Sequence, residues 1–296
     1  MKRLVSGAGV LAVATVAGFW VATQPDPLEP AALDALEMIE ADAARGKAVF
    51  WAGGCAGCHI APDAGDDDRP VLSGGQRFAS DFGTFIAPNI SPDTAHGIGG
   101  WTRAEFATAM MRGVSPDGRH YYPAFPYTAY GRADPRDVAD LHAFVLTLPE
   151  SGVASAAHEL SFPFNLRRAV GLWKRLHLRD DWVMAEAPTP ELARGRYLVE
   201  ALAHCAECHT PRDRTGGLDT TAWMRGAPNP SGQGRIPDIT PAELGWSAQD
   251  IALYLESGFT PSFDVAGGSM AAVVRAMARL SADDRDAIAA YLLHLD

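Results

Sequence analysis

Cysteine is scarce in this sequence of 296 residues, which contains four, all within two C-x-x-C-H motifs. No thiol remains for a separate disulfide or a catalytic nucleophile. Positive charge is also in short supply, since 25 lysines and arginines stand against 36 acidic residues and leave a formal net charge of −11. This excess argues against nucleic acid as a partner and favours proteins with a basic face. The chain also lacks a nucleotide-binding glycine motif and an alternating strand pattern of useful length.

The two motifs run from Cys55 to His59 and from Cys205 to His209. The thiols of such a motif lie one helical turn apart and each can form a thioether with a porphyrin vinyl group, while the histidine reaches the iron. A structural zinc site would place its cysteine pairs about 15–20 residues apart, and a thioredoxin-like redox motif would sit near a βαβ pattern. Disulfides between the motifs would leave both histidines unexplained. We therefore predict two covalently bound haem c groups, held by Cys55, Cys58, His59, Cys205, Cys208 and His209.

The N-terminal segment has the pattern of a membrane anchor. A basic leader, Met1 to Arg3, precedes 20 uncharged residues from Leu4 to Thr23. At about 1.5 Å per residue, a helix of this length covers the ~30 Å hydrocarbon core of a bilayer. Small residues near Trp20 do not fall at both positions of a cleavage site, so we expect an uncleaved signal anchor, with signal cleavage as the alternative. The flanking charges place the rest of the chain on the periplasmic side of a bacterial inner membrane, where c-type haem is attached.

The rest of the chain repeats itself at an offset of 145 to 150 residues. Arg45-Gly46 before the first motif corresponds to Arg194-Gly195 before the second, and Pro88-Asn89-Ile90 corresponds to Pro237-Asp238-Ile239. An ordered series of matches at nearly constant spacing indicates a duplicated unit. The predicted organisation is an anchor at 1–23, a linker at 24–43, domains at 44–150 and 191–296, and a connecting strap at 151–190.

Each unit is predicted to be mainly helical. A capping box is expected to open a middle helix, and a glycine in the left-handed conformation is expected to end it. A further N-cap residue opens a final helix whose apolar positions recur on one face. The residues at these positions are Thr102, Gly113 and Asp134 in the first unit, and Ser247, Gly258 and Ser281 in the second. The strap carries too many apolar side chains for a solvated tether, so we expect a packed segment with a short helix, or a docking or membrane-surface element.

This order of elements resembles the class I cytochrome c fold over both units. The resemblance implies a mainly α protein with two tandem class I cytochrome c domains, a structured strap and an N-terminal transmembrane helix. It also implies that the proximal histidines donate hydrogen bonds to the carbonyls of Pro88 and Pro237. In that family the first and last helices cross at a glycine and an aromatic residue. The implied contacts join Gly46 and Phe50 to Phe144, and Gly195 and Val199 to Tyr291.

A narrower resemblance rests on the segments 82–90, 99–101, 116–127 and 162–166. They are similar to the multihaem cytochrome c subunits of membrane-bound bacterial alcohol and aldehyde dehydrogenases, many of which have three haem domains. The resemblance implies an electron-transfer subunit, not an enzyme on its own, that passes electrons from a periplasmic dehydrogenase to a downstream oxidase or cytochrome of the respiratory chain. The alternative is a dihaem peroxidase-like enzyme that uses the first haem.

The sixth ligand of each iron is expected to differ between the domains. Met270 stands where the family places its ligand methionine, with Met277 as the second choice, and a histidine–methionine pair raises the reduction potential of the iron. In the first domain Phe125 stands where related subunits commonly have methionine, and phenylalanine cannot ligate iron. The candidates for the first iron are therefore His120, Met110, Met111, His96 or no residue at all.

Overall fold

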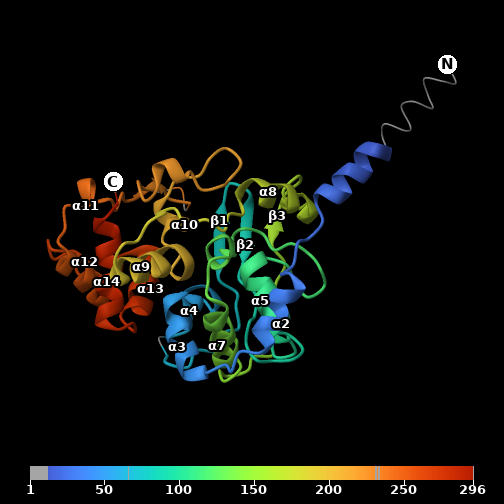
Figure 1. Ribbon diagram of the computed structural model, residues 1–296, viewed down its shortest axis with the longest axis horizontal. Helices are drawn as coiled ribbons and strands as arrows, with labels where there is room; N and C mark the ends of the chain where they lie inside the picture. The colour runs from blue at the N-terminus through green and yellow to red at the C-terminus, as the bar shows by residue number, and fades with distance from the viewer. Residues whose placement is uncertain (1–12, 66, 231, 233, 296) are drawn as a thin grey trace, which may run out of the picture.

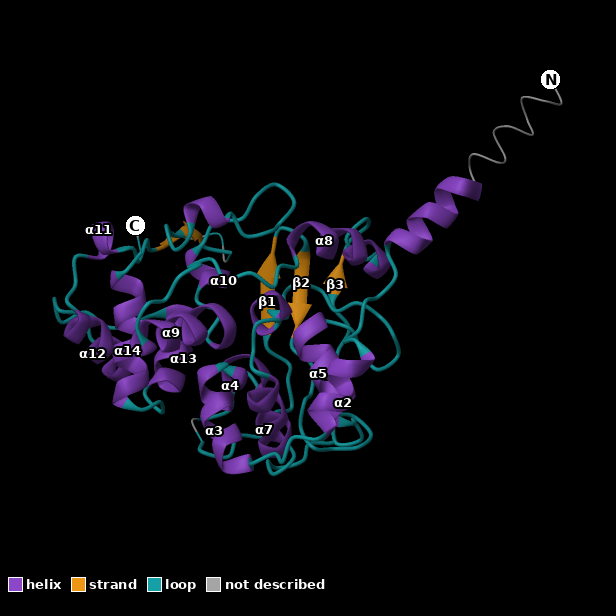
Figure 2. Cartoon of the chain, viewed as in Figure 1, coloured by secondary structure: helices purple, strands orange, loops and turns teal. Residues whose placement is uncertain are grey.

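The protein is described from a computed structural model that covers residues 13–65, 67–230, 232 and 234–295. Two mainly helical domains lie side by side, and a helix near the N-terminus projects away from the first of them (Figures 1 and 2). The domains follow the two halves of the sequence repeat.

The first domain contains α3 (Ala43–Ala52), α4 (Cys55–His59), α5 (Arg103–Arg112), α6 (Tyr127–Tyr130) and α7 (Pro135–Val145). Helices α3 and α7 cross so closely that a Cβ atom on Gly46 would lie 1.9 Å from the carbonyl oxygen of Asp140. The rings of Phe50 and Phe144 pack beside the crossing, with their centroids 5.3 Å apart. The predicted contact of the first and last helices is confirmed here.

The second domain repeats this arrangement. Its helices are α9 (Pro190–Arg196), the π-helical η2 (Tyr197–Leu202), α10 (Ala206–His209), η3 (Thr220–Ala222), α11 (Pro241–Leu244), α12 (Ala248–Ser257), α13 (Gly268–Met277) and α14 (Ala282–Leu293). A Cβ atom on Gly195 would lie 2.0 Å from the carbonyl oxygen of Ala287 and 2.9 Å from the Cβ of Tyr291. The second predicted crossing, between α9 and α14, is therefore also present.

The predicted helix boundaries are confirmed by the capping contacts. Thr102 and Ser247 form complete capping boxes, because the N3 residue of each helix bonds back to the N-cap backbone. Gly113 and Gly258 end these helices with φ angles of 60° and 78°. Asp134 and Ser281 accept the amides that open the final helices.

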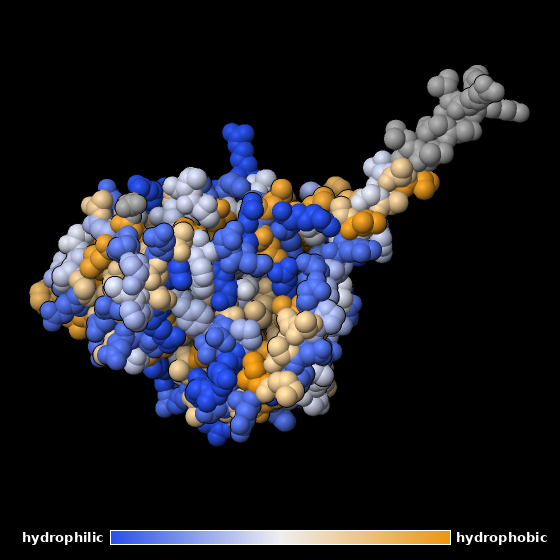
Figure 3. Space-filling view, viewed as in Figure 1, coloured by the Kyte–Doolittle hydropathy of each residue, from blue (hydrophilic) through white to orange (hydrophobic). Residues whose placement is uncertain are grey.

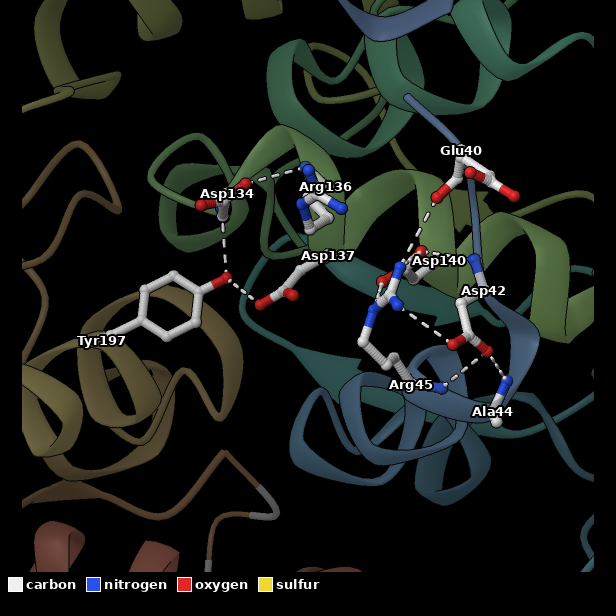
Figure 4. A network of polar contacts seen from close by, with 9 residues as sticks. All are labelled: Glu40, Asp42, Ala44, Arg45, Asp134, Arg136, Asp137, Asp140 and Tyr197. Atoms are coloured by element: carbon white, nitrogen blue, oxygen red, sulfur yellow. Dashed lines mark hydrogen bonds and ion pairs between the residues drawn. The ribbon is translucent and has the colours of Figure 1, made fainter. Parts of the chain in front are cut away.

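A charged network fixes the first crossing (Figure 4). The Arg45 guanidinium donates to both carboxylate oxygens of the buried Asp140, at 2.7 and 3.1 Å, and the Asp42 amide donates at 2.6 Å. Although burial of Asp140 opposes it, these donors lower the pKa of that carboxyl group. In a separate group of contacts on α7, the Tyr197 hydroxyl of the second domain donates to Asp137 over 2.6 Å and so joins the domains.

Short strands occur where we expected only loops. Strand β1 (Arg77–Ser80) pairs antiparallel with β2 (Gly83–Ile86), and β3 (Glu159–Leu160) of the strap adds to the other edge of β2. A smaller pair, β4 (Ala227–Pro228) and β5 (Arg235–Ile236), lies in the second domain. The expectation was wrong because the strands are only two to four residues long, too short for an alternation pattern, and because β3 comes from a distant part of the chain.

The strap packs over the first domain, as predicted. It contains η1 (Arg167–Ala169) and α8 (Val170–His177). The Lys174 ammonium is buried and donates to the carbonyls of Arg112 and Gly113, at 2.5 and 2.7 Å, where α5 ends. Val170 joins Phe85 and Tyr122 in a small apolar cluster. The strap is therefore part of the folded body of the protein.

The N-terminal helix is described over residues 13–22, and its exposed apolar side chains stand clear of the body (Figure 3). Arg168 of the strap donates to Thr23 Oγ1 over 3.0 Å and lies 3.9 Å from the Trp20 ring. Residues 1–12 of the expected anchor lie outside the described residues. Within the described ranges, no helix is long and apolar enough to cross a bilayer. The anchor therefore stays a prediction.

The segment between the anchor and the first domain is also ordered against the body. It contains α2 (Pro30–Glu37), whose Leu36 is buried. Arg103 of α5 donates to the carbonyls of Leu36 and Ile39, at 3.0 and 2.8 Å. The expected linker at 24–43 thus includes a helix that packs on the first domain.

Candidate haem sites

The first C-x-x-C-H motif forms the short helix α4, which begins after Gly54 at a φ angle of 62°. The His59 ring donates from Nδ1 to the carbonyl of Pro88 over 2.8 Å. The Gly74 amide donates to the His59 carbonyl over 2.7 Å, and a Cβ atom on Gly74 would lie 2.5 Å from the carbonyl oxygen of Ala87. Glycine is therefore needed for the Pro88 loop to approach the histidine.

The second motif repeats these contacts. His209 donates from Nδ1 to the carbonyl of Pro237 over 2.9 Å. The Gly226 amide donates to the His209 carbonyl over 2.7 Å, and a Cβ atom on Gly226 would lie 2.6 Å from the carbonyl oxygen of Ile236. Both predicted hydrogen bonds to proline carbonyls are present, and each leaves Nε2 as the nitrogen that can face an iron atom.

The residues at both motifs fit covalent haem. None of the four cysteines pairs in a disulfide, so all four are available for thioether bonds. Burial lowers the pKa of both His59 and His209, which favours the neutral imidazole that binds metal. In the described ranges, no group of His, Cys, Asp or Glu residues suits another metal ion. Haem would supply one-electron redox chemistry when bound. The four motif cysteines would hold its edge, and the hydrogen bonds to Pro88 and Pro237 would orient the two imidazoles.

Met270, the predicted ligand of the second iron, lies in the first turn of α13 and packs against the core without being fully buried. Met277 lies at the last turn of the same helix and is almost completely buried. This placement agrees with core packing for Met277. Ligation by Met270 stays a prediction.

Phe125, at the corresponding place in the first domain, belongs to an aromatic cluster with Tyr121, Tyr127 and Tyr130. His120 is buried beneath the strap, and its Nε2 donates to the carbonyl of Thr23 over 3.0 Å. One ring nitrogen of this candidate ligand is thereby committed to the backbone that follows the N-terminal helix.

The other candidates for the first iron have different surroundings. Met110 and Met111 are buried in the apolar core, and Met110 occupies the position of Leu255 in the repeat. His96 is exposed in a loop. The sixth ligand of the first iron therefore stays open among the predicted residues.

A feature that sequence reasoning missed is the direct contact of the two motifs. His204, which precedes Cys205, donates from Nε2 to the carbonyl of Gly53 over 3.3 Å. The same carbonyl accepts the Tyr130 hydroxyl over 3.0 Å, and the rings of Tyr130 and His204 meet edge to face. Burial, with a further contribution from the Cys208 thiol, raises the pKa of Cys58 to about 11. The cysteine-bearing segments of the two domains therefore face each other.

The contact is reciprocal. Helix α6 of the first domain packs on η2 of the second, while α13 of the second packs on α3 and α4 of the first. In the first motif, a Cβ atom on Gly57 would lie 3.6 Å from the Cβ of Ala272 in α13. Arg279 lies 4.2 Å from the centroid of the Trp51 ring of α3. Helix α13 of the second domain thus covers the first haem motif. Helix α6 of the first domain lies beside the second motif, where Thr128 donates to Glu207.

Comparison with known proteins agrees with this geometry. The family described as Cytochrome c matches residues 43–149 and 192–296, and the chain belongs to this family. A protein of Cereibacter sphaeroides named diheme cytochrome c-type is 53% identical over 98% of this chain and 97% of its own length. The fructose dehydrogenase cytochrome subunit of Gluconobacter japonicus is 34% identical over 98% of this chain, which spans 59% of that protein.

A further relative is the cytochrome c subunit of a quinone alcohol dehydrogenase from Gluconobacter oxydans. It is 33% identical over 88% of this chain, and the match spans 56% of that protein. The resemblance to cytochrome c and to dehydrogenase cytochrome subunits is confirmed by these matches. The two matched domains are in keeping with two haem c groups.

Proposed function

We propose that this protein is a membrane-anchored dihaem cytochrome c that carries electrons from a periplasmic dehydrogenase to an oxidase or another cytochrome of the respiratory chain. The observation that carries the proposal is the contact between the two haem motifs through His204 and Gly53, because it brings two redox groups together within one chain. The names of the relatives support a dehydrogenase as the electron donor. None of those named here is a peroxidase, so we do not pursue the peroxidase-like alternative.

The acidic surface and the N-terminal segment support the remaining parts of the proposal. A net charge of −11 favours fast, salt-sensitive association with basic-faced redox partners. The uncharged sequence from Leu4 to Thr23 supports an anchor that keeps the carrier at the periplasmic face of the inner membrane.

The proposal is tested with a form in which a cleavable export signal replaces residues 1–18. This form keeps Trp20 and Thr23, which the strap contacts. We expect a soluble protein that carries two covalent haems by mass. It should restore substrate-dependent oxygen uptake to membranes from a strain that lacks the gene, and less so at high salt.

A single haem, bound zinc, or turnover of a small substrate by the purified chain alone would contradict the proposal. A form that restores oxygen uptake but associates with membranes as strongly as the full chain would contradict the anchor alone.

A further inference from the structure

The loops that follow the middle helices of the two domains have the same length and the same backbone bonds. Residues 113–121 of the first domain correspond to 258–266 of the second. The bridge between Val114 and His120 recurs between Phe259 and Val265. The bond from the residue 121 amide to the Gly113 carbonyl, at 2.7 Å, recurs from residue 266 to residue 258 at 2.8 Å. The two loops are therefore equivalent surfaces, each beside the place expected for a sixth ligand.

In the first domain this loop is covered by the strap. Lys174 donates to the carbonyls that end α5, and Arg167 lies 4.8 Å from the ring of Tyr122. A Cβ atom on Gly171 would lie 2.9 Å from His120 Nε2. As a result, Val114 is 4% exposed and His120 is 2% exposed. The cover is a short amphipathic helix whose buried lysine donates hydrogen bonds to the last carbonyls of α5.

In the second domain the equivalent loop is open. Phe259 is 52% exposed and Val265 is 59% exposed, although they match the two buried residues of the first domain. Helix α12 ends here without a basic residue in its last turn, whereas Lys174 supplies one to α5. Asp264, also exposed, adds negative charge beside this helix end, whereas Glu256 is paired with Arg285 over 3.0 Å. The open loop therefore offers an apolar surface beside helix-end carbonyls that can accept hydrogen bonds.

Phe263, at the tip of the open loop, is strained and exposed. Its φ angle is 64° and its side chain is 90% exposed. The equivalent residue of the first domain is Gly118, with a φ angle of 71°. A bulky residue in the left-handed region is rare, and here the aromatic ring gains no packing within the chain in return. A strained aromatic side chain kept on the surface, where glycine would serve, is the kind of outlier that marks a binding site.

We propose that the loop of residues 258–266 is the docking surface for a redox partner, which covers it with a basic amphipathic helix as the strap covers the first domain. Phe263 anchors the partner helix, and a lysine of that helix binds the carbonyls of Ser257 and Gly258. This inference rests on the proposed function, because it names the surface through which the second haem exchanges electrons. The exposed Asp264 beside the loop attracts the basic helix.

The probe for this surface is a synthetic peptide with the sequence of residues 165–179 of this chain, which includes Trp173 and Lys174. It is titrated into the full-length holoprotein in detergent, and quenching of its tryptophan fluorescence by haem reports binding. We expect saturable binding that weakens at least about tenfold in Phe263→Gly, as loss of an interface anchor commonly produces. Because Gly118 occupies the equivalent place, Phe263→Gly should fold and melt no lower than the wild type.

The control variant is Met38→Gly, which removes an 86% exposed apolar side chain at the end of α2 and should leave peptide affinity unchanged. A peptide with glutamate in place of Lys174 should also bind more weakly. The inference is overturned by equal affinity for wild type and Phe263→Gly, or by no saturable quenching up to about 1 mM peptide. The inference is also overturned if the wild type forms a dimer and Phe263→Gly is a monomer, because the loop would then bind a second copy of this chain. Haem content and reduction by ascorbate report on the proposed function separately from peptide binding.

Discussion

At the residue scale, the two proximal histidines are held in one tautomer by backbone carbonyls. His59 and His209 each donate from Nδ1, and glycines at positions 74 and 226 let the acceptor loops approach. Such a bond fixes the orientation of the ring and raises the basicity of the ligand. Since these bonds are the same in both domains, we expect the difference between Met270 and Phe125 to be the main source of any difference in potential between the haems.

The first prediction concerns that difference. Met270→Ala should abolish the near-infrared band of methionine-ligated oxidised haem and lower one of two reduction potentials, because the thioether favours the reduced iron. Phe125→Met should create a second such band. Spectra and redox titrations check both. Persistence of the band in Met270→Ala would point to Met277 or to a methionine of the first domain, and an unchanged Phe125→Met spectrum would place residue 125 away from the iron.

The second prediction concerns acid sensitivity of the first domain. His142 of α7 is buried against Phe106, and burial, with a contribution from Arg103, lowers its pKa to about 4, against an ordinary value of 6.5. At pH 7 both folded and unfolded chains hold the neutral ring. As the pH falls from 6.5 towards 4, the unfolded chain takes up a proton that the folded chain excludes, so the free energy of unfolding decreases by up to about 3 kcal/mol.

The measurement is denaturant unfolding of wild type and His142→Gln at pH 7 and at pH 4.5. The wild type should lose more stability between the two values than the variant, whose side chain does not titrate. An equal loss in both proteins would show that the ring is protonated in the folded domain.

At the element scale, both domains depend on a glycine at a helix crossing. Gly46→Ala and Gly195→Ala would place a Cβ atom within 2.0 Å of a carbonyl oxygen of the partner helix. We expect each to destabilise its own domain by about 2–3 kcal/mol, because the helices must separate. In the control, Gly152→Ala, the added atom meets nothing within 4 Å, so the change should stay within about 0.5 kcal/mol.

The measurement is unfolding of each domain, followed by the loss of its own haem spectrum. Comparable stability of Gly46→Ala and Gly152→Ala would show that the α3–α7 crossing adapts to the added methyl group.

The elements that the sequence predicted are those with local signals. Thr102 and Ser247 begin capping boxes that need only four adjacent residues, and the glycines that end these helices are equally local. Strand β2 was missed because its partners are a four-residue strand and a strap segment about 75 residues away. The π-helical η2 was missed because its residues have an ordinary helical pattern.

Of the candidate sites, the haem attachment residues were predicted from the two motifs, and the hydrogen bonds to the proline carbonyls were predicted from the resemblance to class I cytochrome c. The packing of the strap on the loop of residues 113–121 could not be predicted from the sequence, because Lys174 binds backbone carbonyls, which carry no sequence signal. His204 could have been found, because the repeat pairs it with Gly54, and both residues take a left-handed φ. A histidine where the other repeat has glycine is the signal that was available.

At the scale of the whole molecule, the two domains form a reciprocal pair in which each haem motif lies beside the other domain. This arrangement is not encoded in either repeat alone, because it depends on the side chains at the interface. His204 is central to it. Its φ angle of 43° costs about 1–2 kcal/mol relative to glycine, while its bond to Gly53 and its ring contact with Tyr130 contribute a similar amount.

These magnitudes lead to the last prediction. In His204→Gly the released backbone strain offsets the lost contacts, so overall stability should change by less than about 1 kcal/mol. The coupling of the domains should nevertheless weaken, because the bridge between the two motifs is gone. We expect both haems to attach, the two domains to unfold in more widely separated transitions, and electron equilibration between the haems after flash reduction to slow.

His294→Gly, which removes an exposed histidine of the second domain, is the control and should match the wild type. If both transitions and equilibration rate stay unchanged in His204→Gly, the domains are held together by α13 and Arg279 instead, and the histidine is only a strained neighbour of Cys205.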